Sequence, residues 1–279
     1  MINKKFTRWL VITDLDGTLL NHHDYATDMA VPAIQKLQSL EIPIIFNTSK
    51  TFSESASIQK YLNIQAPFIV ENGSCIYIPK NLHSQKTINK PYHSREEYWE
   101  FLLGMTHENI SNILNKIDTP ESYYQLLSKC NAEEASKLTG LNISQAEQAI
   151  SREFSEPLIW KASDKALTIF KNQLHGYNLN TLQGGRFLHV LGNCDKGIAT
   201  NKLKELLSAP DKNFKTIVLG DSENDAAMLL QSDISIIINS PSNHQLLNIV
   251  TPTLQSKNQA PEGWAESIYT ALNIIKELE

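Results

Sequence analysis

The chain has 279 residues, of which 41% are hydrophobic, enough to bury a sizeable core in one large domain or two unequal ones. Its formal net charge is -5, and it lacks both the basic surface expected of nucleic-acid-binding proteins and the basic amphipathic stretch of membrane-surface proteins. No apolar run approaches the roughly 20 residues that span a bilayer, the one near the amino terminus is too short for a signal peptide, and three scattered cysteines exclude a disulfide framework or zinc site. We therefore expect a cytoplasmic enzyme that binds neither nucleic acid nor membranes; the sequence gives no indication of its oligomeric state.

The first part of the chain alternates between strand and helix patterns. Short apolar, β-branched runs at Trp9–Thr13, Pro43–Phe46 and Phe68–Val70 are typical of buried parallel strands. Helical spacing of apolar residues follows the first run, and a helix that opens near Ser53 follows the second. This alternation predicts a parallel sheet with right-handed crossovers.

The composition changes near residue 80, where a polar stretch from Asn81 to Ser94 begins a region with different patterns. Tyr98, Phe101, Leu102 and Met105 indicate one helical face. Two further helices are indicated by Asn131 with Glu134 and a closing Gly140, and by Ser144 with Glu147. Short strands are predicted at Leu158–Trp160, Leu179–Leu182 and Phe187–Leu191. These patterns predict a separate, inserted α+β unit.

Strand and helix patterns alternate again after residue 195. A helix follows Lys196, strands are predicted at Thr216–Leu219 and Ile234–Ile238, and an amphipathic helix runs from Trp264 to Leu278. The predicted fold class is therefore α/β. We expect a Rossmann-like, doubly wound parallel sheet from residues 1–84 and 190–279, with an inserted α+β cap domain at residues 85–189.

Two acidic residues, Asp14 and Asp16, directly follow the first predicted strand. Open α/β sheets bind ligands at the carboxyl ends of their strands, and Gly17 allows a sharp turn there. Two neighbouring carboxylates beside an apolar strand are costly unless a cation or a proton transfer uses them. The alternative is an ordinary Asx-type turn.

A second acidic group follows the strand that ends at Leu219. Asp221 and Asp225 lie at the start of a predicted helix, where Asp221 or Ser222 could act as an N-cap. Capping accounts for one polar residue, but it does not account for an acidic cluster that matches the one at Asp14. The two clusters together therefore favour a cation-binding or catalytic site.

With Thr48 at the end of the second strand and Lys196 at a helix start, these two clusters resemble, in order, the four motifs of the haloacid dehalogenase superfamily. The resemblance implies that Asp14 attacks phosphorus and forms an aspartyl-phosphate, while Asp16 protonates the leaving group and then takes a proton from water. It implies that Thr48 hydrogen-bonds the phosphoryl group and that Lys196 neutralises its charge. For either Thr48 or Lys196 taken alone, a strand-end hydroxyl or a surface lysine is the simpler interpretation.

The resemblance also implies a magnesium ion. Asp14, the backbone carbonyl of Asp16, and Asp221 would hold it, with Asp225 supporting the metal directly or through water. Mg²⁺ prefers oxygen ligands, which suits a carboxylate cluster without histidine or cysteine.

Three segments further resemble the family of mannosyl-3-phosphoglycerate phosphatases, whose type II caps also lie between the second and third motifs. They are Asn47–Thr51, with Lys50 where relatives often carry arginine, Ile69–Gly73, and Gln183–His189. The implied reaction converts mannosyl-3-phosphoglycerate to mannosylglycerate, and the expected cap arginines would hold the substrate carboxylate. The substrate-binding residues so expected are Lys50, Asn72, Arg152, Gly184, Gly185, Arg186 and His189.

Several alternatives remain open from the sequence. Gly184 and Gly185 could form a plain hairpin turn, Arg152 could pair with a surface glutamate, and His189 could be structural. The substrate could be glucosyl-3-phosphoglycerate, sucrose phosphate or a hexose phosphate. A mutase or a non-catalytic sugar-phosphate-binding protein would be a different class, although the latter should lack one of the carboxylates.

Overall fold

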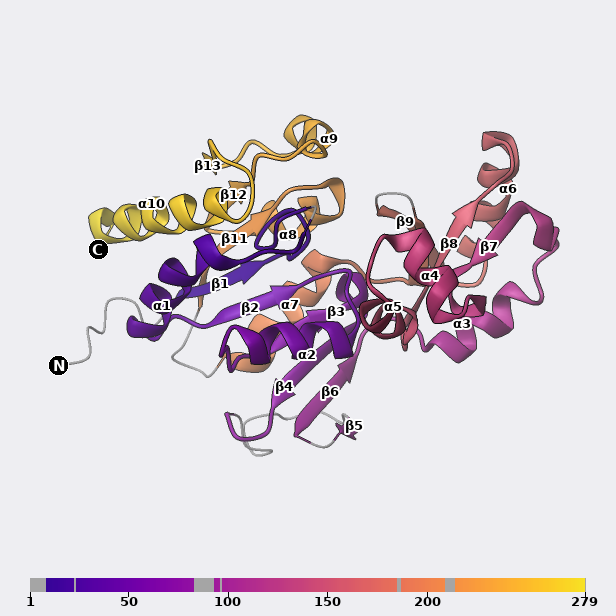
Figure 1. The fold of residues 1–279 in the computed structure, drawn as a ribbon, viewed down its shortest axis with the longest axis horizontal. Coiled ribbons are helices and arrows are strands. Elements are labelled where there is room, and N and C mark those ends of the chain that lie inside the picture. Colours follow the sequence, from indigo (N-terminus) through magenta and orange to yellow (C-terminus); the bar gives the residue numbers. More distant parts are fainter. Residues whose placement is uncertain are drawn as a thin grey trace.

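The computed structural model describes residues 9–22, 24–82, 93–95, 97–184, 187–208 and 214–278. Its central strand is β1 (Trp9–Thr13), all five residues of which are buried. β1 pairs with a parallel strand along each of its edges, and its side chains are buried on both faces of the sheet. The predicted buried strand is therefore the middle of a large sheet (Figure 1).

Nine strands form this sheet within the described residues. Their spatial order is β13 (Leu254–Gln255), β12 (Ile234–Ile237), β11 (Lys215–Gly220), β1, β2 (Ile44–Asn47), β3 (Phe68–Val70), β4 (Cys75–Pro79), β6 (Tyr98–Leu102) and β5 (His93–Arg95). The pairs from β13 to β3 are parallel, whereas β4, β6 and β5 extend the sheet in antiparallel fashion.

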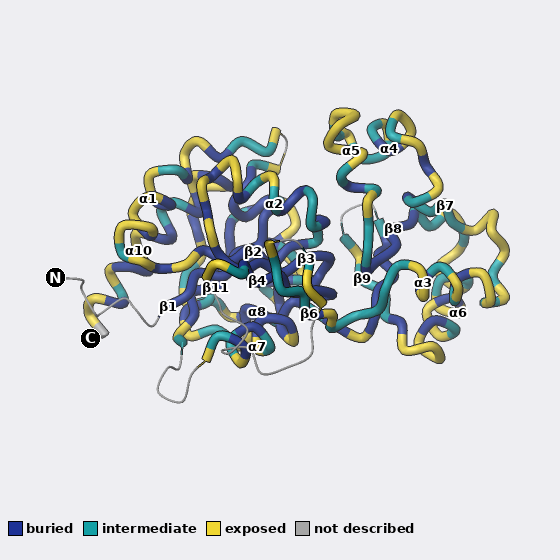
Figure 2. Tube along the Cα trace, turned by 90° about the horizontal axis from the view of Figure 1, so that it is seen from below, coloured by how far each residue is buried: buried dark blue, intermediate teal, exposed yellow. Residues whose placement is uncertain are grey.

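Helices cover both faces of the sheet, as the doubly wound prediction requires. Figure 2 shows one set of helices on one side of the sheet and another set on the other. The first set is α1 (Val31–Ser39), α2 (Phe52–Tyr61) and α10 (Glu262–Leu278), and the second is α7 (Lys196–Leu207) and α8 (Ala226–Leu229). The short helix α9 (Asn243–Ile249) precedes β13. The α/β fold class predicted from the sequence is confirmed.

A second sheet, antiparallel throughout, lies beside the first (Figure 1). Its order is β7 (Tyr124–Leu126), β8 (Ser155–Trp160), β10 (Phe187–Gly192) and β9 (Leu179–Gly184). The helices of this region are α3 (His107–Leu114), α4 (Ala132–Thr139), α5 (Ile143–Ile150) and α6 (Asp164–His175). An apolar cluster of its own, including Leu158, Phe170 and Val190, makes this the inserted α+β unit that the sequence predicts.

The helical face predicted at Tyr98–Met105 is wrong, because residues 98–102 form strand β6. The segment is rich in aromatic residues, which favour strands, and it pairs along its whole length with β4. Since β5 and β6 belong to the large sheet, we propose that the cap begins after Leu102 and ends near Gly192, instead of at the expected residues 85 and 189.

Two helices of the cap begin with capping boxes, one at the residues expected from the sequence and one two residues earlier. Asn131 and Glu134 form the predicted capping box of α4, and Gly140 closes that helix with a φ of 81°. The predicted cap of α5 by Ser144 and Glu147 is wrong, because Asn142 caps this helix. Asn142 has a glutamine three residues later, which completes an equivalent capping box.

The two chain segments that join the cap to the core touch each other. Gly104 lies in the first segment and Gly192 ends the last cap strand, and a Cβ on Gly192 would approach the Cα of Gly104 to 2.8 Å. The polypeptide chain therefore enters and leaves the cap at almost the same place. None of the helices in the described part of the chain is long and apolar enough to cross a membrane.

Candidate active site

The candidate catalytic residues lie at one edge of the large sheet. Asp14 follows β1, Thr48 follows β2 and Asp221 follows β11, and these three strands are parallel neighbours. The backbone amide of Asp14 continues the ladder by donating to the carbonyl of Leu219 at 3.0 Å. Because parallel strands end at the same edge, residues distant in sequence meet here.

Lys196 lies at the centre of this edge. Its Nζ is 2.6 Å from Asp14 Oδ1 and 2.6 Å from Asp225 Oδ1, and its side chain is fully buried. Burial disfavours the ammonium ion, yet the two carboxylates outweigh that cost and raise the pKa of Lys196 above its usual value. Lys196 therefore remains a cation, as the predicted charge-neutralising role requires.

The carboxylates of Asp14, Asp221 and Asp225 form one cluster, with an oxygen atom from each within 4.8 Å of the others. Burial, reinforced by the Asp225 charge, raises the pKa of Asp221 to about 7. Burial also raises the pKa of Asp14 well above its ordinary value, although Lys196 opposes the shift. A cation would relieve this repulsion, and the all-oxygen donor set suits Mg²⁺.

The cluster is fixed by surrounding hydrogen bonds. Asp225 Oδ2 accepts from the backbone amides of Asp221 at 2.9 Å and Ser222 at 3.0 Å. Asp221 accepts from the hydroxyls of Thr18 at 3.1 Å and Ser242 at 3.2 Å. Lys196 and two backbone amides therefore already occupy both oxygens of the Asp225 carboxylate.

The turn after β1 requires a glycine. Gly17 has a φ of 78°, and a Cβ there would lie 2.7 Å from Asp221 Oδ2. Both the backbone conformation and the close approach of the carboxylate exclude a larger side chain. The sequence Asp14–Gly17 thus brings the first acidic motif against the second.

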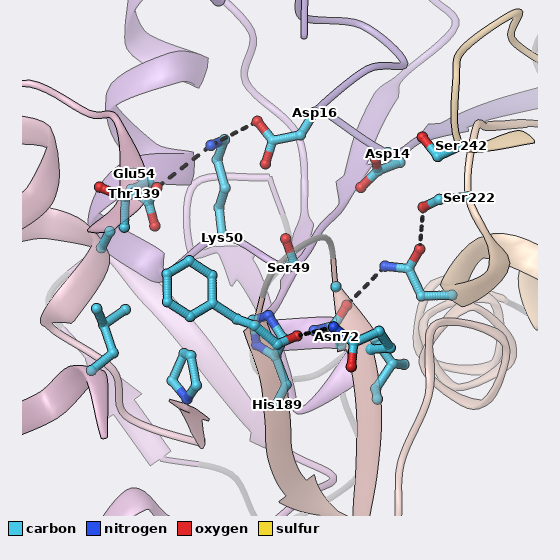
Figure 3. Close-up of a pocket in the computed structure, with 18 of the residues that line it drawn as sticks. Asp14, Asp16, Ser49, Lys50, Glu54, Asn72, Thr139, His189, Ser222 and Ser242 are labelled. Atoms are coloured by element: carbon cyan, nitrogen blue, oxygen red, sulfur yellow. Dashed lines mark hydrogen bonds and ion pairs between the residues drawn. The ribbon is translucent and has the colours of Figure 1, made fainter. Parts of the chain in front are cut away.

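Asp16 lies apart from the carboxylate cluster and pairs with Lys50. The Nζ of Lys50 is 2.8 Å from Asp16 Oδ1 and 3.5 Å from Glu54 Oε1 (Figure 3). It also stands over the ring of Tyr25. Despite burial, the two carboxylates raise the pKa of Lys50 above its usual value. Lys50 is therefore a fixed positive charge in the site, and it orients the Asp16 carboxylate.

Thr48 is buried behind the site. Its Oγ1 accepts from the backbone amide of Lys50 at 3.2 Å, and its own amide donates to the carbonyl of Ile69. Of this loop, Ser49 and Lys50 line the cavity described below, whereas Thr48 does not. In this structure Thr48 shapes the loop that carries Lys50.

Asn72 ends a chain of oriented hydrogen bonds. Ser222 Oγ donates to Asn224 Oδ1 at 2.6 Å, and Asn224 Nδ2 donates to Asn72 Oδ1 at 3.1 Å (Figure 3). The Nδ2 of Asn72 is buried, lacks a hydrogen-bond partner in the described structure, and belongs to a residue that lines the cavity. An amide donor in this position suits an anionic or hydroxyl group of a ligand.

Three of the five residues expected from the cap lie near the site. Arg152 Nη1 donates to the Ser49 carbonyl at 2.7 Å, which ties the cap to the loop after β2. His189 is buried beside Gly184, and burial followed by the nearby charge of Arg152 lowers the pKa of His189 to about 3, so its ring is neutral. Gly185 and Arg186 fall outside the described residues.

A cavity of about 300 Å³ lies between the two units. Asp14, Asp16 and Asp221 contribute from the core, and the cap supplies mostly apolar and neutral groups. The cap residues that line it are Leu127, Thr139, Leu141, Ala149, Arg152, Pro157, Leu182, Gln183, Gly184, Phe187 and His189. The arrangement places a floor of carboxylates, together with Lys50, beneath a wall whose only charged member among the described residues is Arg152.

Sequence reasoning missed two contributors to the site. Glu54 supports Lys50, and its only sequence signal was its place near a predicted helix start, where it forms a capping box with Thr51. Glu71 is buried and binds the cap, but its neighbour Asn72 was selected instead. The role of Glu71 cannot be inferred from the chain alone, because its partners lie more than 80 residues away. Glu54, by contrast, is only four residues from Lys50.

Comparison with known proteins gives consistent matches along the chain. Residues 11–267 match the model of the family described as haloacid dehalogenase-like hydrolase. A protein of Methanococcoides burtonii named glucosyl-3-phosphoglycerate/mannosyl-3-phosphoglycerate phosphatase is 34% identical over 93% of this chain and 95% of its own length. A protein of Persephonella marina with the same name is 33% identical over 96% of this chain and 98% of its own.

The fold also matches solved structures. The crystal structure of SMU.1108c from Streptococcus mutans UA159 superposes with a TM-score of 0.67 at 18% identity, covering 95% of this chain and 98% of that one. At this identity the likeness concerns the fold alone. It includes both the large sheet and the inserted unit, since nearly the whole length of each chain is covered.

Proposed function

The chain belongs to the haloacid dehalogenase-like hydrolases, and we propose that it is a magnesium-dependent phosphatase that cleaves the phosphate monoester of glycosyl-3-phosphoglycerates. The observation that carries the proposal is the cavity between core and cap, with the Asp14 and Asp221 carboxylates on its floor. The names of the two relatives support the choice of substrate.

In the proposed first step, an oxygen of Asp14 attacks the phosphorus and the bond from phosphorus to the ester oxygen breaks. Asp16 acts here in its protonated form and gives its proton to the leaving alkoxide, so that the glycosylglycerate departs neutral at that oxygen. Lys196 holds Asp14 in place and keeps a positive charge beside the phosphoryl group. Thr48 fixes the loop after β2, because its hydroxyl oxygen accepts a hydrogen bond from the Lys50 amide.

In the second step, Asp16 takes a proton from a water molecule that attacks the phosphorus of the aspartyl-phosphate. The bond between phosphorus and the Asp14 oxygen breaks, which releases phosphate and restores both carboxyl groups. A magnesium ion held by Asp14, Asp221 and the Asp16 carbonyl, with Asp225 behind it, would neutralise charge on the phosphoryl oxygens.

The substrate's glyceryl carboxylate requires a cation near the phosphate. Lys50 and Arg152 both line the cavity, and Arg152 contacts the Ser49 carbonyl next to Lys50 in the chain, so we assign the carboxylate to this pair. Asn72, Gly184 and His189 would contact the remaining oxygens of the substrate. Gly185 and Arg186 stay candidates on the sequence alone.

The experiment measures phosphate release with magnesium from mannosyl- and glucosyl-3-phosphoglycerate, sucrose 6-phosphate and simple hexose phosphates. Preference for the two phosphoglycerate esters is the expected result. Equal, weak rates on all substrates would retain a phosphatase and reject this substrate class. Absence of release from every substrate would contradict the proposed activity, and a chelator should stop any release that is seen.

A further inference from the structure

Glu71 binds the cap through three hydrogen bonds. Its Oε1 accepts from the backbone amide of Glu153 at 3.0 Å, and its Oε2 accepts from the amide of Phe154 at 3.2 Å and the Ser155 hydroxyl at 2.5 Å. Glu71 belongs to the core, in the turn η3 (Glu71–Gly73) between β3 and β4, and only 1% of it is exposed. A buried carboxylate so fully bonded fixes the segment that it contacts.

The segment that Glu71 holds directly follows Arg152. From there, Arg152 reaches back to the core, and its Nη1 donates to the Ser49 carbonyl beside the cavity. Arg95 of β5 binds the side chain of Glu153 at 2.7 Å, but it does so on the outer, partly exposed side. Glu71 is therefore the buried anchor next to the arginine that faces the site.

The turn that carries Glu71 is also hydrogen-bonded to the loop after β2, which lies at the end of the sheet that carries the catalytic residues. The amide of Glu71 donates to the Lys50 carbonyl at 3.0 Å, and the amide of Asn72 donates to the Thr48 carbonyl at 2.9 Å. Gly73 lies against Asp195, so closely that a Cβ there would collide with the Asp195 carbonyl. The turn thus contacts the loop after β2, the start of α7 and the cap.

We propose that Glu71 is a positioning residue that sets the cap over the catalytic edge and holds Arg152 in place for the anionic, non-reacting part of the substrate. The inference rests on the proposed function, because it assigns Arg152 to that part of a glycosyl-3-phosphoglycerate. It predicts that Glu71 affects substrates that reach Arg152 and spares substrates that do not.

Glu71→Gln is the test variant. Glutamine keeps the size of the side chain, but it places an amide N–H group opposite the donors of residues 153–155. Two substrates are compared, namely the preferred glycosyl-3-phosphoglycerate and p-nitrophenyl phosphate, which has no carboxylate. For the first, we expect KM to rise on the order of tenfold, since at least one charged hydrogen bond is lost, with kcat changed less than about threefold. For the second, kcat/KM should stay within about threefold of the wild type.

Three further variants complete the comparison. Arg152→Ala should raise KM at least as much, and the double variant should match Arg152→Ala alone, because Glu71 acts through Arg152. Glu156→Gln alters another buried carboxylate of the same segment, which contacts His107 and Ser128 within the cap, and should leave KM unchanged. If Glu71→Gln does not fold, Ser155→Ala removes one of the three bonds, together with the 3.4 Å contact from Arg152 Nη1 to the same hydroxyl, and should raise KM about threefold.

Two results would show that Glu71 only stabilises the fold and would overturn the inference. One is an equal loss of kcat/KM on both substrates in Glu71→Gln, and the other is a rise in KM of the double variant equal to the product of the two single rises. The wild-type rates are read separately. If the wild type prefers another sugar phosphate, the proposed substrate is wrong, and the same four variants are measured on that substrate beside p-nitrophenyl phosphate. An unchanged KM for Glu71→Gln would then overturn the inference as well.

Discussion

Lys196 is a buried cation that pairs with two buried carboxylates, Asp14 and Asp225. Lys196→Met should leave Asp14 and Asp225 unpaired and lower the free energy of unfolding by about 3–5 kcal/mol, with activity falling at least about a hundredfold. Urea unfolding and phosphate release measure the two effects. Lys202→Met, which alters a surface pair on the same helix, should stay within about 0.5 kcal/mol of the wild type. Equal effects of the two variants would contradict the buried-pair argument.

Asp14→Asn tests the proposed nucleophile, since an amide cannot form the aspartyl-phosphate. We expect phosphate release to fall by at least about three orders of magnitude while near-ultraviolet circular dichroism keeps its wild-type form. The asparagine keeps a hydrogen-bond acceptor for Lys196, so the fold should persist. Turnover above trace levels would assign the attack to another group.

The pKa of Asp221 predicts how metal binding depends on pH. Because burial raises this pKa to about 7 in the metal-free protein, a proton competes with magnesium below that pH. The apparent Kd for magnesium should therefore rise as pH falls from 8 to 6, and calorimetry in two buffers should detect proton release on binding. A Kd independent of pH in this window would contradict the raised pKa.

The raised pKa of Asp221 also makes the free energy of unfolding of the metal-free protein depend on pH. The folded-state pKa of Asp221 exceeds its unfolded value of about 3.9, so the folded, metal-free protein binds this proton more tightly. That contribution to the free energy of unfolding is present below about pH 3.9 and is lost as pH rises through about 7. Magnesium should reverse the trend, because it favours the ionised carboxylate.

At the scale of elements, the turn after β1 controls how closely the two acidic motifs approach. Gly17→Ala forces a Cβ toward Asp221 Oδ2 at a φ that alanine rarely adopts. We expect a loss of about 1–3 kcal/mol in the free energy of unfolding and weaker magnesium binding. Gly140→Ala is a suitable control, since that glycine has a similar φ but no neighbour within 4 Å. If both variants lose stability alike and bind magnesium normally, backbone strain alone is responsible.

The parallel elements were predictable from the sequence because their signals are local. β1, β2 and β11 are apolar runs that end in polar motifs, and chain order alone places Asp14 and Asp221 at one edge. The antiparallel extension was not predictable in the same way, because β6 shows a mixed pattern whose strand form depends on pairing with β4. The Asp16–Lys50 pair and the Glu71 contacts likewise arise only from tertiary structure.

At the scale of the whole molecule, selectivity depends on a cavity that neither unit forms alone. Its cap wall is mostly apolar, and the neutral ring of His189 is one of the few polar groups there that could distinguish one hydroxyl orientation. We therefore expect kcat/KM for the mannosyl and glucosyl esters to agree within about tenfold, since apolar contacts discriminate weakly. Steady-state kinetics on both esters measures this ratio. A preference beyond about a thousandfold would require a buried polar partner for that hydroxyl.

The contact between Gly104 and Gly192 means that the cap leaves and rejoins the core at almost one point. Chain ends that already touch can be closed by a short turn or occupied by a different insert without disturbing the sheet. The inserted cap can therefore be exchanged for another recognition domain, by evolution or by design, while the catalytic residues of the core keep their positions.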